Sequence, residues 1–513
     1  MTYSPIQSFT HSPIAPQFFP LTKSGICLTF APMSSDKYQV VIGLEVHAQL
    51  LTKTKLFCSD STAFGAEPNT QVSPISLAHP GTLPKMNKRA IELAVKLGLA
   101  LHCEIERHNY FARKNYFYPD LPKGYQVSQH TAPICKGGYL SVKTADGEKN
   151  IELNRIHLEE DAGKSIHDID PAYTCIDLNR AGVPLLEIVT EPCIHSAAEA
   201  FAFLTELRKL VRWLEVCDGN MEEGSMRCDA NISIRLQGET TLGKRVEVKN
   251  LNSIRNVKKA IEIEQERLIA LAERKEPVIQ ETRSFDADNN TTFSLRSKEE
   301  ADDYRYFPEP DLPPFSVSEA YIKNIAGSMP ALPEQLIKKY MTEFSLPEYD
   351  AGVICNDKED ADFFEGLTRH TKHYKPAANW MLGPLKFYCN ENNISIASFP
   401  LNAEAVASLV DLTESGQVNF NNASTKILQE LIKNPGSSAA AIAASLNLLQ
   451  ETDSGAMEDW VNEVISTMPE KVKEYKAGKK GLIGLFAGEV KKKSKGKADM
   501  QVVNKLLEEK LKH

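Results

Sequence analysis

The stretch from Val40 to Leu50 alternates its side chains with the period of two that is typical of a β-strand lying on a hydrophobic core. One face is wholly apolar, whereas the other carries Gly43, Glu45, His47 and Gln49 beside Val41. The same alternation recurs at residues 226–236 and 244–250. These segments predict a sheet with one buried face and one polar face.

The polar faces of these strands carry mixed charges. They hold Arg227, Asp229, Asn231, Ser233 and Arg235 in one strand, and Arg245, Glu247 and Lys249 in the other. Carboxylates and an imidazole placed two residues apart on a pleat lie close enough to ligate one hard cation, with arginines nearby for phosphate. The pattern favours nucleotide-dependent phosphoryl transfer, although the polar face of an antiparallel sheet usually just meets water.

A further segment, residues 155–161, ends in Glu159 and Glu160. Glu160 shares its face with Ile156 and Leu158, so the alternation predicts that its side chain projects from a buried side. We include it among the candidate site residues.

Helical periodicity appears at residues 87–105, 196–216 and 253–273, each behind a capping residue. Strands and helices without regular alternation predict an α+β fold with an antiparallel sheet. The proline-rich residues 307–315 mark the end of this first body. Beyond it the periodicity is almost entirely helical, and we divide it near residue 405. The expected helices span residues 333–345, 358–370, 376–392, 403–415, 422–434, 438–448, 456–467 and 499–511.

Composition agrees with a water-soluble chain of two to four domains, since 513 residues are too many for one core. Its hydrophobic fraction is 42% and its charged fraction is 25%. No apolar run approaches the length of about 20 residues that a membrane span needs. Ten cysteines without a C-x-x-C pair suit a reducing compartment, so we expect a cytoplasmic protein.

Charge is distributed unevenly along the chain. From Lys471 to the end there are thirteen Lys against five acidic residues, a net charge of +8, whereas the whole chain carries −9. A basic tail on an acidic body is expected of an appendage that binds a polyanion, and the alternative is a solvated lysine-rich helix end. Residues 1–32 contain one Lys and no acidic residue. We expect them to be an extra segment that is disordered or precedes a true start at Met33.

Familiar nucleotide and hydrolase motifs are absent. Residues 161–165, DAGKS, end like a phosphate-binding P-loop, but Leu158 stands where that loop needs glycine. The sequence contains neither H-E-x-x-H nor G-x-S-x-G, which argues against a zincin or an α/β-hydrolase. A nucleotide would therefore lie on a sheet.

Long motifs resemble those of the GatB family, the B subunits of the aspartyl/glutamyl-tRNA amidotransferases. They include VIGLEVHAQLLTKTKLF, PGTLPKMNKRA, RKNYFYPDLPKGYQVSQ, HLEEDAGKS, DLNRAGVPLLEIVTEP, MEEGSMRCDANISIR, EVKNLNS and DDYRYFPEPDLPP. The resemblance runs in order from about residue 38 to residue 315 and resumes down to residues 494–511.

The resemblance implies an enzyme subunit that uses ATP and Mg²⁺ to activate the side-chain carboxylate of Glu-tRNA(Gln) or Asp-tRNA(Asn). Ammonia would come from the amidase of the complex, its A subunit, while the small C subunit would complete a heterotrimer. It also implies a cradle domain at residues 33–315 related in fold to glutamine synthetase, a helical domain at 316–405, and a YqeY-like, tRNA-binding tail domain at 406–513. The alternatives are a non-catalytic tRNA-docking scaffold of the same complex and a free-standing ligase of small amino acids.

Residue by residue, the resemblance places Glu45, His47, Glu160 and Glu247 at the family's catalytic Mg²⁺ site. Asp229, Lys249 and Glu159 lie in the same motifs and are candidates for nucleotide or substrate contact. From charge and placement alone, Arg227, Arg180 and Lys164 are candidates for stabilising phosphate, and the alternative for each is an ion pair within the sheet.

The chain departs from the family at a zinc knuckle. Many members carry four cysteines at the positions of Cys58, Asp60, Ser73 and Ser76, and only the first is kept here. One thiolate with serines does not make the tetrahedral four-ligand site of structural zinc, so we predict no zinc.

Overall fold

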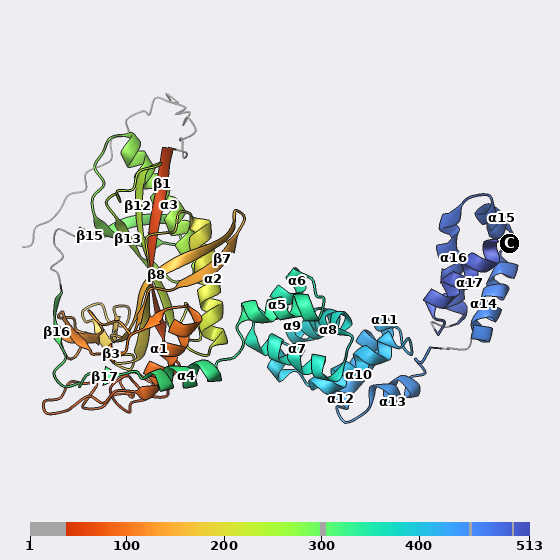
Figure 1. The fold of residues 1–513 in the computed structure, drawn as a ribbon, viewed down its shortest axis with the longest axis horizontal. Helices are drawn as coiled ribbons and strands as arrows, with labels where there is room; N and C mark the ends of the chain where they lie inside the picture. The colour runs from red at the N-terminus through yellow and green to blue at the C-terminus, as the bar shows by residue number, and fades with distance from the viewer. Residues whose placement is uncertain (1–36, 298–303, 451–453, 495–496, 513) are drawn as a thin grey trace, which may run out of the picture.

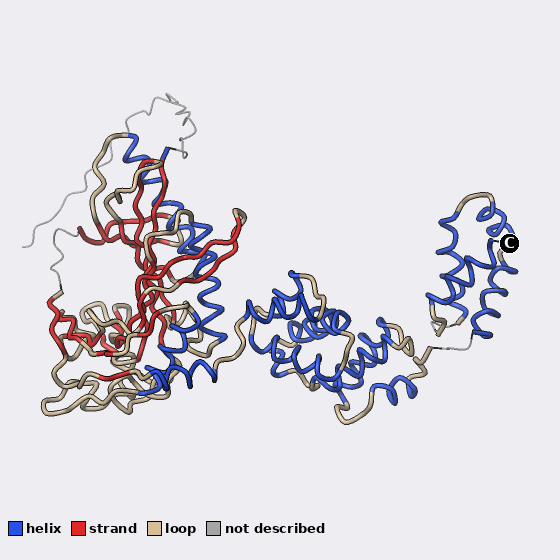
Figure 2. The backbone as a smooth tube through the Cα atoms, viewed as in Figure 1, coloured by secondary structure: helices blue, strands red, loops and turns tan. Residues whose placement is uncertain are grey.

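The computed structural model describes residues 37–297, 304–450, 454–494 and 497–512, and Figure 1 shows three bodies in chain order. Strands are confined to the first body among the described residues, and the other two bodies are helical (Figure 2). The predicted extra segment 1–32 and the predicted start at Met33 lie outside the described residues. An α+β body followed by helical bodies is the class expected from the sequence.

One large sheet organises the first body, with the strand order β15-β14-β13-β12-β1-β11-β8-β5-β4-β16. Its central strands are β1 (Tyr38–Gln49), β8 (Gly147–Glu160), β11 (Pro184–Thr190), β12 (Met226–Leu236) and β13 (Val246–Leu251). Its outer strands are β4 (Ala112–Asn115), β5 (Tyr125–Ser128), β14 (Glu281–Asp286), β15 (Thr291–Ser297) and β16 (Arg305–Pro308). The remaining strands are β2 (Glu104–Ile105), β3 (His108–Asn109), β6 (Cys135–Lys136), β7 (Tyr139–Thr144), β9 (Lys164–Ile166), β10 (Cys175–Asp177) and β17 (Phe315–Ser316).

The apolar face of the sheet forms the core of this body. Ile42, Leu44 and Val46 of β1 are fully buried, as the alternation predicts. They belong to one hydrophobic cluster with side chains of α1 (Lys88–Ala100), α2 (Ala197–Trp213) and α3 (Ile254–Glu273). Each of these helices begins behind a capping residue, as the sequence predicts, because the side chains of Asn87, Ser196 and Ser253 each accept a hydrogen bond from a backbone N–H of the first turn. For α3 the sequence left Asn252 and Ser253 as alternatives, and the cap is Ser253.

The prediction of a wholly antiparallel sheet is wrong at one pair of strands. β13 and β14 run parallel, with Glu247 opposite Thr282. Helix α3 lies between them in sequence, and a strand–helix–strand crossover returns the chain in the same direction. The sequence contains all three elements of this unit, but their pairing is a tertiary feature.

The second body is a helical array. It contains α5 (Pro333–Glu343), α6 (Glu348–Ile354), α7 (Lys358–His370), α8 (Tyr374–Trp380), α9 (Lys386–Glu391), α10 (Ala403–Glu414), α11 (Phe420–Asn422), α12 (Leu428–Lys433) and α13 (Ala439–Ser445). The helix expected at 376–392 is divided by a π-helical turn at Met381–Leu385, which contains Pro384. Proline lacks the N–H that an α-helix needs at that point, so the local hydrogen-bonding pattern changes.

The third body comprises α14 (Ser454–Thr467), α15 (Pro469–Lys476), α16 (Ile483–Lys493) and α17 (Met500–Lys512). These helices have a hydrophobic cluster of their own, in which Met457 and Val461 pack with Val503 and Leu507. The division predicted near residue 405 falls at the start of α10, which packs on α7 in the second body. The separate core begins at Met457 instead.

Helix α4 (Glu319–Ser328) follows β17 and packs against α1, so it lies with the first body. None of the described helices has both the length and the apolar character needed to cross a lipid bilayer.

Candidate active site

The polar face of the central strands forms one continuous charged surface. In the register of the sheet, Glu45 lies opposite Asp229, and His47 lies opposite Arg227 on one side and Glu187 on the other. Glu247 of β13, the strand on the other side of β12, lies opposite Asn231. Side chains directly opposite in an antiparallel pair are close neighbours, so the pairing gathers charges from β13, β12, β1 and β11.

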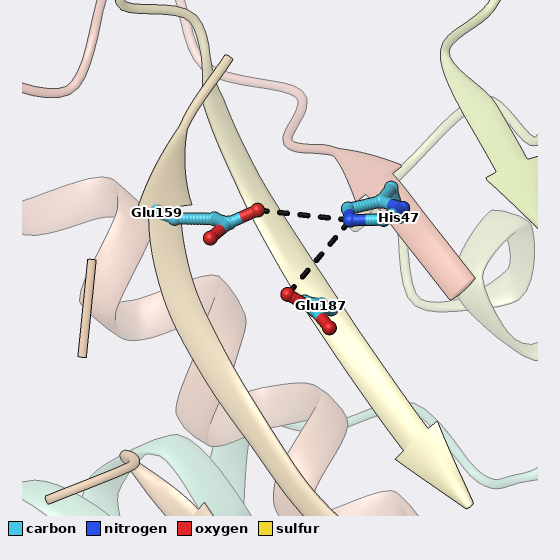
Figure 3. A group of neighbouring side chains, drawn as sticks. All are labelled: His47, Glu159 and Glu187. Carbon is cyan, nitrogen blue, oxygen red and sulfur yellow. Dashed lines mark ion pairs between the residues drawn. The ribbon is translucent and has the colours of Figure 1, made fainter. Parts of the chain in front are cut away.

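His47, Glu159 and Glu187 form the first of two compact groups on this surface, with ligand atoms that all lie within 4.8 Å of one another. Figure 3 shows the three side chains converging from β1, β8 and β11. His47 Nε2 lies 3.7 Å from Glu159 Oε1 and 3.8 Å from Glu187 Oε2. An imidazole with two carboxylates at this spacing suits a divalent cation.

His157 lies beside this group on β8 and is buried. Its Nε2 is 3.0 Å from Glu187 Oε2 and 3.6 Å from Glu159 Oε2. Burial opposes the charged imidazole, but the two carboxylates outweigh it and raise the pKa of His157 to about 9. His157 therefore supplies positive charge behind both carboxylates at neutral pH.

Glu45, Asp229 and Glu247 form the second group, again with ligand atoms within 4.8 Å of one another. Burial and the neighbouring carboxylates of Glu187, Glu247 and Asp229 raise the pKa of Glu45, because ionised carboxylates in one place repel each other. Lys249 Nζ lies 2.5 Å from Asp229 Oδ2 and 3.1 Å from Glu247 Oε1. The group thus gathers three carboxylates, of which Lys249 contacts two, and a divalent cation would relieve the excess negative charge.

The structure divides the four residues predicted to share one cation. Glu45 and Glu247 lie in the second group, and His47 lies in the first. Within the described residues Glu160 belongs to neither group. Its carboxylate pairs with Lys123 and accepts a hydrogen bond of 2.9 Å from the backbone N–H of Val127. The alternation explains this, because Glu160 points to the opposite side of β8 from Glu159.

Sequence reasoning missed Glu187 and His157 and gave Glu159 only a secondary place. His157 and Glu159 alternate with the apolar Ile156 and Leu158, which is the pattern used to select Glu45. Glu187 shares its face with Leu185 and Val189, so its strand shows no polar stripe. Only the pairing of β11 beside β1 brings it to His47.

The arginines make ion pairs and backbone contacts. Arg227 Nη2 lies 2.8 Å from Asp161 Oδ2, and Arg180 Nε lies 3.8 Å from the same oxygen. Arg180 also donates to the backbone carbonyls of Ala162 and Gly163. Lys164 is exposed and lies opposite Asp177 in a separate two-stranded sheet. Arg180 therefore fits an ion pair better than a phosphate contact. Arg227 makes an ion pair and also lines a cavity.

Two cavities open on the polar face, and both fall in the size range of ligand sites. We call them the His47 cavity, of about 620 Å³, and the Gly43 cavity, of about 460 Å³. The His47 cavity is lined by His47, Lys114, Tyr116, Glu159, Arg227, Asp229 and Lys249, among others. The Gly43 cavity is lined by Val41, Gly43, Glu45, Asn231, Ser233, Lys244, Arg245 and Gln280, among others.

The four positions of the family's zinc knuckle also lie together, joined by hydrogen bonds. Ser76 Oγ donates to Asp60 Oδ2 over 2.6 Å and accepts from the backbone N–H of Ser73 over 2.9 Å. Burial raises the pKa of the Cys58 thiol to about 11, which disfavours the thiolate that zinc needs. Elemental analysis of the purified protein is expected to find no stoichiometric zinc, and one zinc per chain that resists a chelator would contradict this prediction.

Comparisons with known proteins agree over most of the chain. The model of the GatB/GatE catalytic domain matches residues 40–323, and that of the GatB domain matches residues 362–511. Proteins named as the B subunit of aspartyl/glutamyl-tRNA(Asn/Gln) amidotransferase are similar over nearly their whole length. That of Thermodesulfovibrio yellowstonii is 48% identical over 92% of this chain and 98% of its own. That of Trichlorobacter lovleyi is 48% identical over 93% of this chain and 99% of its own.

Proposed function

Because the chain belongs to the GatB family, the B subunits of the aspartyl/glutamyl-tRNA(Asn/Gln) amidotransferases, we propose that it uses ATP to activate the side-chain carboxylate of Glu-tRNA(Gln), Asp-tRNA(Asn) or both. The observation that carries the catalytic role is the pair of acidic groups on the polar face, one around His47 and one around Glu45. A scaffold that only docked tRNA would have no need to gather five carboxylates and an imidazole on one surface.

In the proposed reaction, an oxygen of the side-chain carboxylate attacks the γ-phosphorus of ATP. The bond from that phosphorus to the β,γ-bridging oxygen breaks, and ADP leaves with the electron pair. The nitrogen of ammonia then attacks the acyl carbon, the bond from that carbon to the phosphate oxygen breaks, and the leaving phosphate takes up the proton that the nitrogen loses. The products are the side-chain amide, phosphate and ADP.

The residues of the chain would act by binding and positioning. Glu45, Asp229 and Glu247 fit one Mg²⁺, and His47, Glu159 and Glu187 fit a second. When bound, Mg²⁺ would neutralise charge on phosphate oxygens. Lys249 and Arg227, held by carboxylates on the wall of the His47 cavity, restrain those carboxylates and offer positive charge to a bound anion.

Replacing His47 by Ala tests this proposal in the heterotrimer reconstituted from this chain, the amidase and the small third protein of the complex. Loss of one of three ligands is expected to lower the rate of Gln-tRNA(Gln) formation roughly 10- to 100-fold. Labelled ATP and Glu-tRNA(Gln) are the substrates, and ammonium chloride replaces glutamine so that the rate does not depend on glutamine hydrolysis by the amidase. An unchanged rate in His47→Ala would reject the catalytic role.

We also propose that the third body binds tRNA. The segment from Lys471 onward carries a net charge of +8, and its core includes side chains of α14. A truncation should therefore end at Gln450, because a cut at Lys471 would strip α14 of its packing partners. We expect the truncated chain to show a KM for aminoacyl-tRNA raised about tenfold or more, with a weaker salt dependence. If the truncation lowers tRNA-independent ATP hydrolysis by as large a factor as it raises the KM for aminoacyl-tRNA, the third body has a structural role instead.

A further inference from the structure

The second body meets the first at the C-terminal end of α2, where two ion pairs join them. Arg212 Nη1 lies 3.0 Å from Asp357 Oδ1, and Lys358 Nζ lies 2.5 Å from Glu215 Oε1. The end of α2 presents a cation followed by an anion, whereas the start of α7 presents an anion followed by a cation. We call these two contacts the crossed pairs. All four residues line a cavity of about 420 Å³ between the two bodies.

Glu215 occupies a backbone position that usually belongs to glycine. Its φ is 55°, in the left-handed region, directly after the C-cap of α2. The N–H of Val216 donates to the carbonyl of Val211 over 2.9 Å, as in the Schellman motif that ends many helices. Glycine adopts this conformation without the steric cost that a Cβ brings. Glutamate is therefore a costly residue for α2 itself, and its pair with Lys358 offsets that cost.

Asp357 likewise gives up a local role. It is the N-cap residue of α7, with extended backbone, and aspartate is among the best N-cap residues. Within α7, which the structure describes throughout, its side chain accepts no capping hydrogen bond, and it pairs with Arg212 instead. Both acids of the crossed pairs thus serve the contact between the bodies rather than the helix that each one flanks.

Two further contacts cross the same junction. The buried Trp213 donates from Nε1 to the backbone carbonyl of Ala331, over 3.0 Å, in the link between α4 and α5. Lys143 of β7 lies 2.5 Å from Glu348 of α6. The side chains of the three ion pairs at the junction are 31–68% exposed, and salt weakens exposed pairs. The junction therefore combines a buried point of contact with ion pairs that salt can release.

From these contacts we infer that the crossed pairs form a latch that fixes the angle of the second body on the first. Figure 1 shows the second body between the first and the third. Lys497 of the third body donates to Asn447 of the second over 2.9 Å, so the third body moves with the second. The latch thereby sets how the third body faces the polar side of the sheet. This consequence for tRNA rests on the proposed function, in which the third body binds tRNA.

Cross-linking of the full chain reports the angle without touching the crossed pairs. A water-soluble carbodiimide joins the Lys143 amine to the Glu348 carboxylate only while the two are in contact, and mass spectrometry of the peptides quantifies the link. The pair of Lys339 and Glu365, with atoms 2.9 Å apart inside the second body, gives a reference link. The measured quantity is the ratio of the first link to the reference link.

Arg212→Glu is expected to lower this ratio about fivefold or more, because it places two negative charges against each other. Arg212→Glu combined with Asp357→Arg reverses the polarity of the pair and should return the ratio to within about twofold of the wild type. Glu215→Gly should lower the ratio about twofold although glycine suits the backbone there. A role confined to ending α2 would leave the ratio unchanged.

Salt provides a test without mutation. About 1 M NaCl, at which the screening length is about 3 Å, should lower the ratio in the wild type. Lys433→Glu is the matched control, because Lys433 pairs with Glu430 inside α12 and the change reverses a charge away from the junction. The latch is overturned if Arg212→Glu leaves the ratio unchanged, if the control lowers it equally or if the reversed pair does not restore it.

Kinetics of the reconstituted heterotrimer, with ammonium chloride as the nitrogen source, test the consequence for tRNA. Arg212→Glu should raise the KM for Glu-tRNA(Gln) about fivefold, since apparent affinity scales with the fraction of molecules in the competent state, and leave the KM for ATP unchanged. A lower cross-linking ratio with an unchanged KM for tRNA would overturn this consequence. Cross-linking needs neither ATP nor tRNA, so failure of the proposed function would appear separately, as a wild-type complex that forms no Gln-tRNA(Gln).

Discussion

Glu45→Gln is expected to lower ATP-dependent amidation of Glu-tRNA(Gln) by roughly 10²- to 10³-fold, because it removes a charged oxygen from the group where phosphate charge must be neutralised. Glu45 belongs to the acidic group with Asp229 and Glu247 and accepts a hydrogen bond of 2.9 Å from Asn231 Nδ2. Glutamine keeps the shape of the side chain but not its charge. The measurement is the single-turnover rate of the heterotrimer at saturating MgCl₂.

The same variant has an expected signature in stability. The pKa of Glu45 is raised in the folded chain, so stability falls as the pH rises from the unfolded-state pKa through the folded-state pKa, and glutamine removes this cost. Without Mg²⁺ the variant should melt no lower than the wild type at pH 8, and the rise in Tm on adding MgCl₂ should shrink. Glu239→Gln, at an exposed turn, is the control. Full activity of the variant, or an unchanged rise in its Tm on adding MgCl₂, would contradict the assignment of Glu45 to the metal site.

Arg283→Ala is expected to lower the free energy for opening the β13–α3–β14 unit by about 3 kcal/mol, the scale for breaking a buried ion pair. Glu264 of α3 is fully buried and lies 3.1 Å from Arg283 Nε and 2.7 Å from Arg267 Nη2. Arg283 Nη2 also donates to the backbone carbonyl of Thr292 over 2.8 Å. Removing Arg283 leaves the Glu264 carboxylate with one cation in a dry environment.

Hydrogen exchange of the amides of α3 and β14 measures this opening directly, which avoids treating a chain with several bodies as one two-state unit. Arg274→Ala, at an exposed pair on the C-terminal end of the same helix, is expected to change the opening by less than about 1 kcal/mol. Equal effects of the two variants would show that the Glu264 pair does not hold the unit together.

Much of the fold follows from patterns that are local in sequence. Period-two alternation identifies the buried and polar faces of β1, since burial acts on each side chain according to its place on the pleat. The capping residues Asn87, Ser196 and Ser253 set the starts of α1, α2 and α3. These helices satisfy their first N–H groups within the same turn, so no distant residue is needed.

Strand pairing decided the rest. Which strands become neighbours depends on how the whole chain packs, so the placement of β11 beside β1 and the parallel pairing of β14 with β13 are not visible in any single segment. The residues of the candidate site likewise divide into those that the sequence predicted and those that only strand pairing revealed. Local alternation placed Glu45, His47, Asp229 and Glu247 on the polar face, and the family resemblance singled out Glu45, His47 and Glu247 among its residues. Only the register of the sheet added Glu187 and brought Glu159 to His47, because a carboxylate's neighbours across strands are determined by tertiary structure. Alternation already set Glu160 on the opposite side of its strand from Glu159.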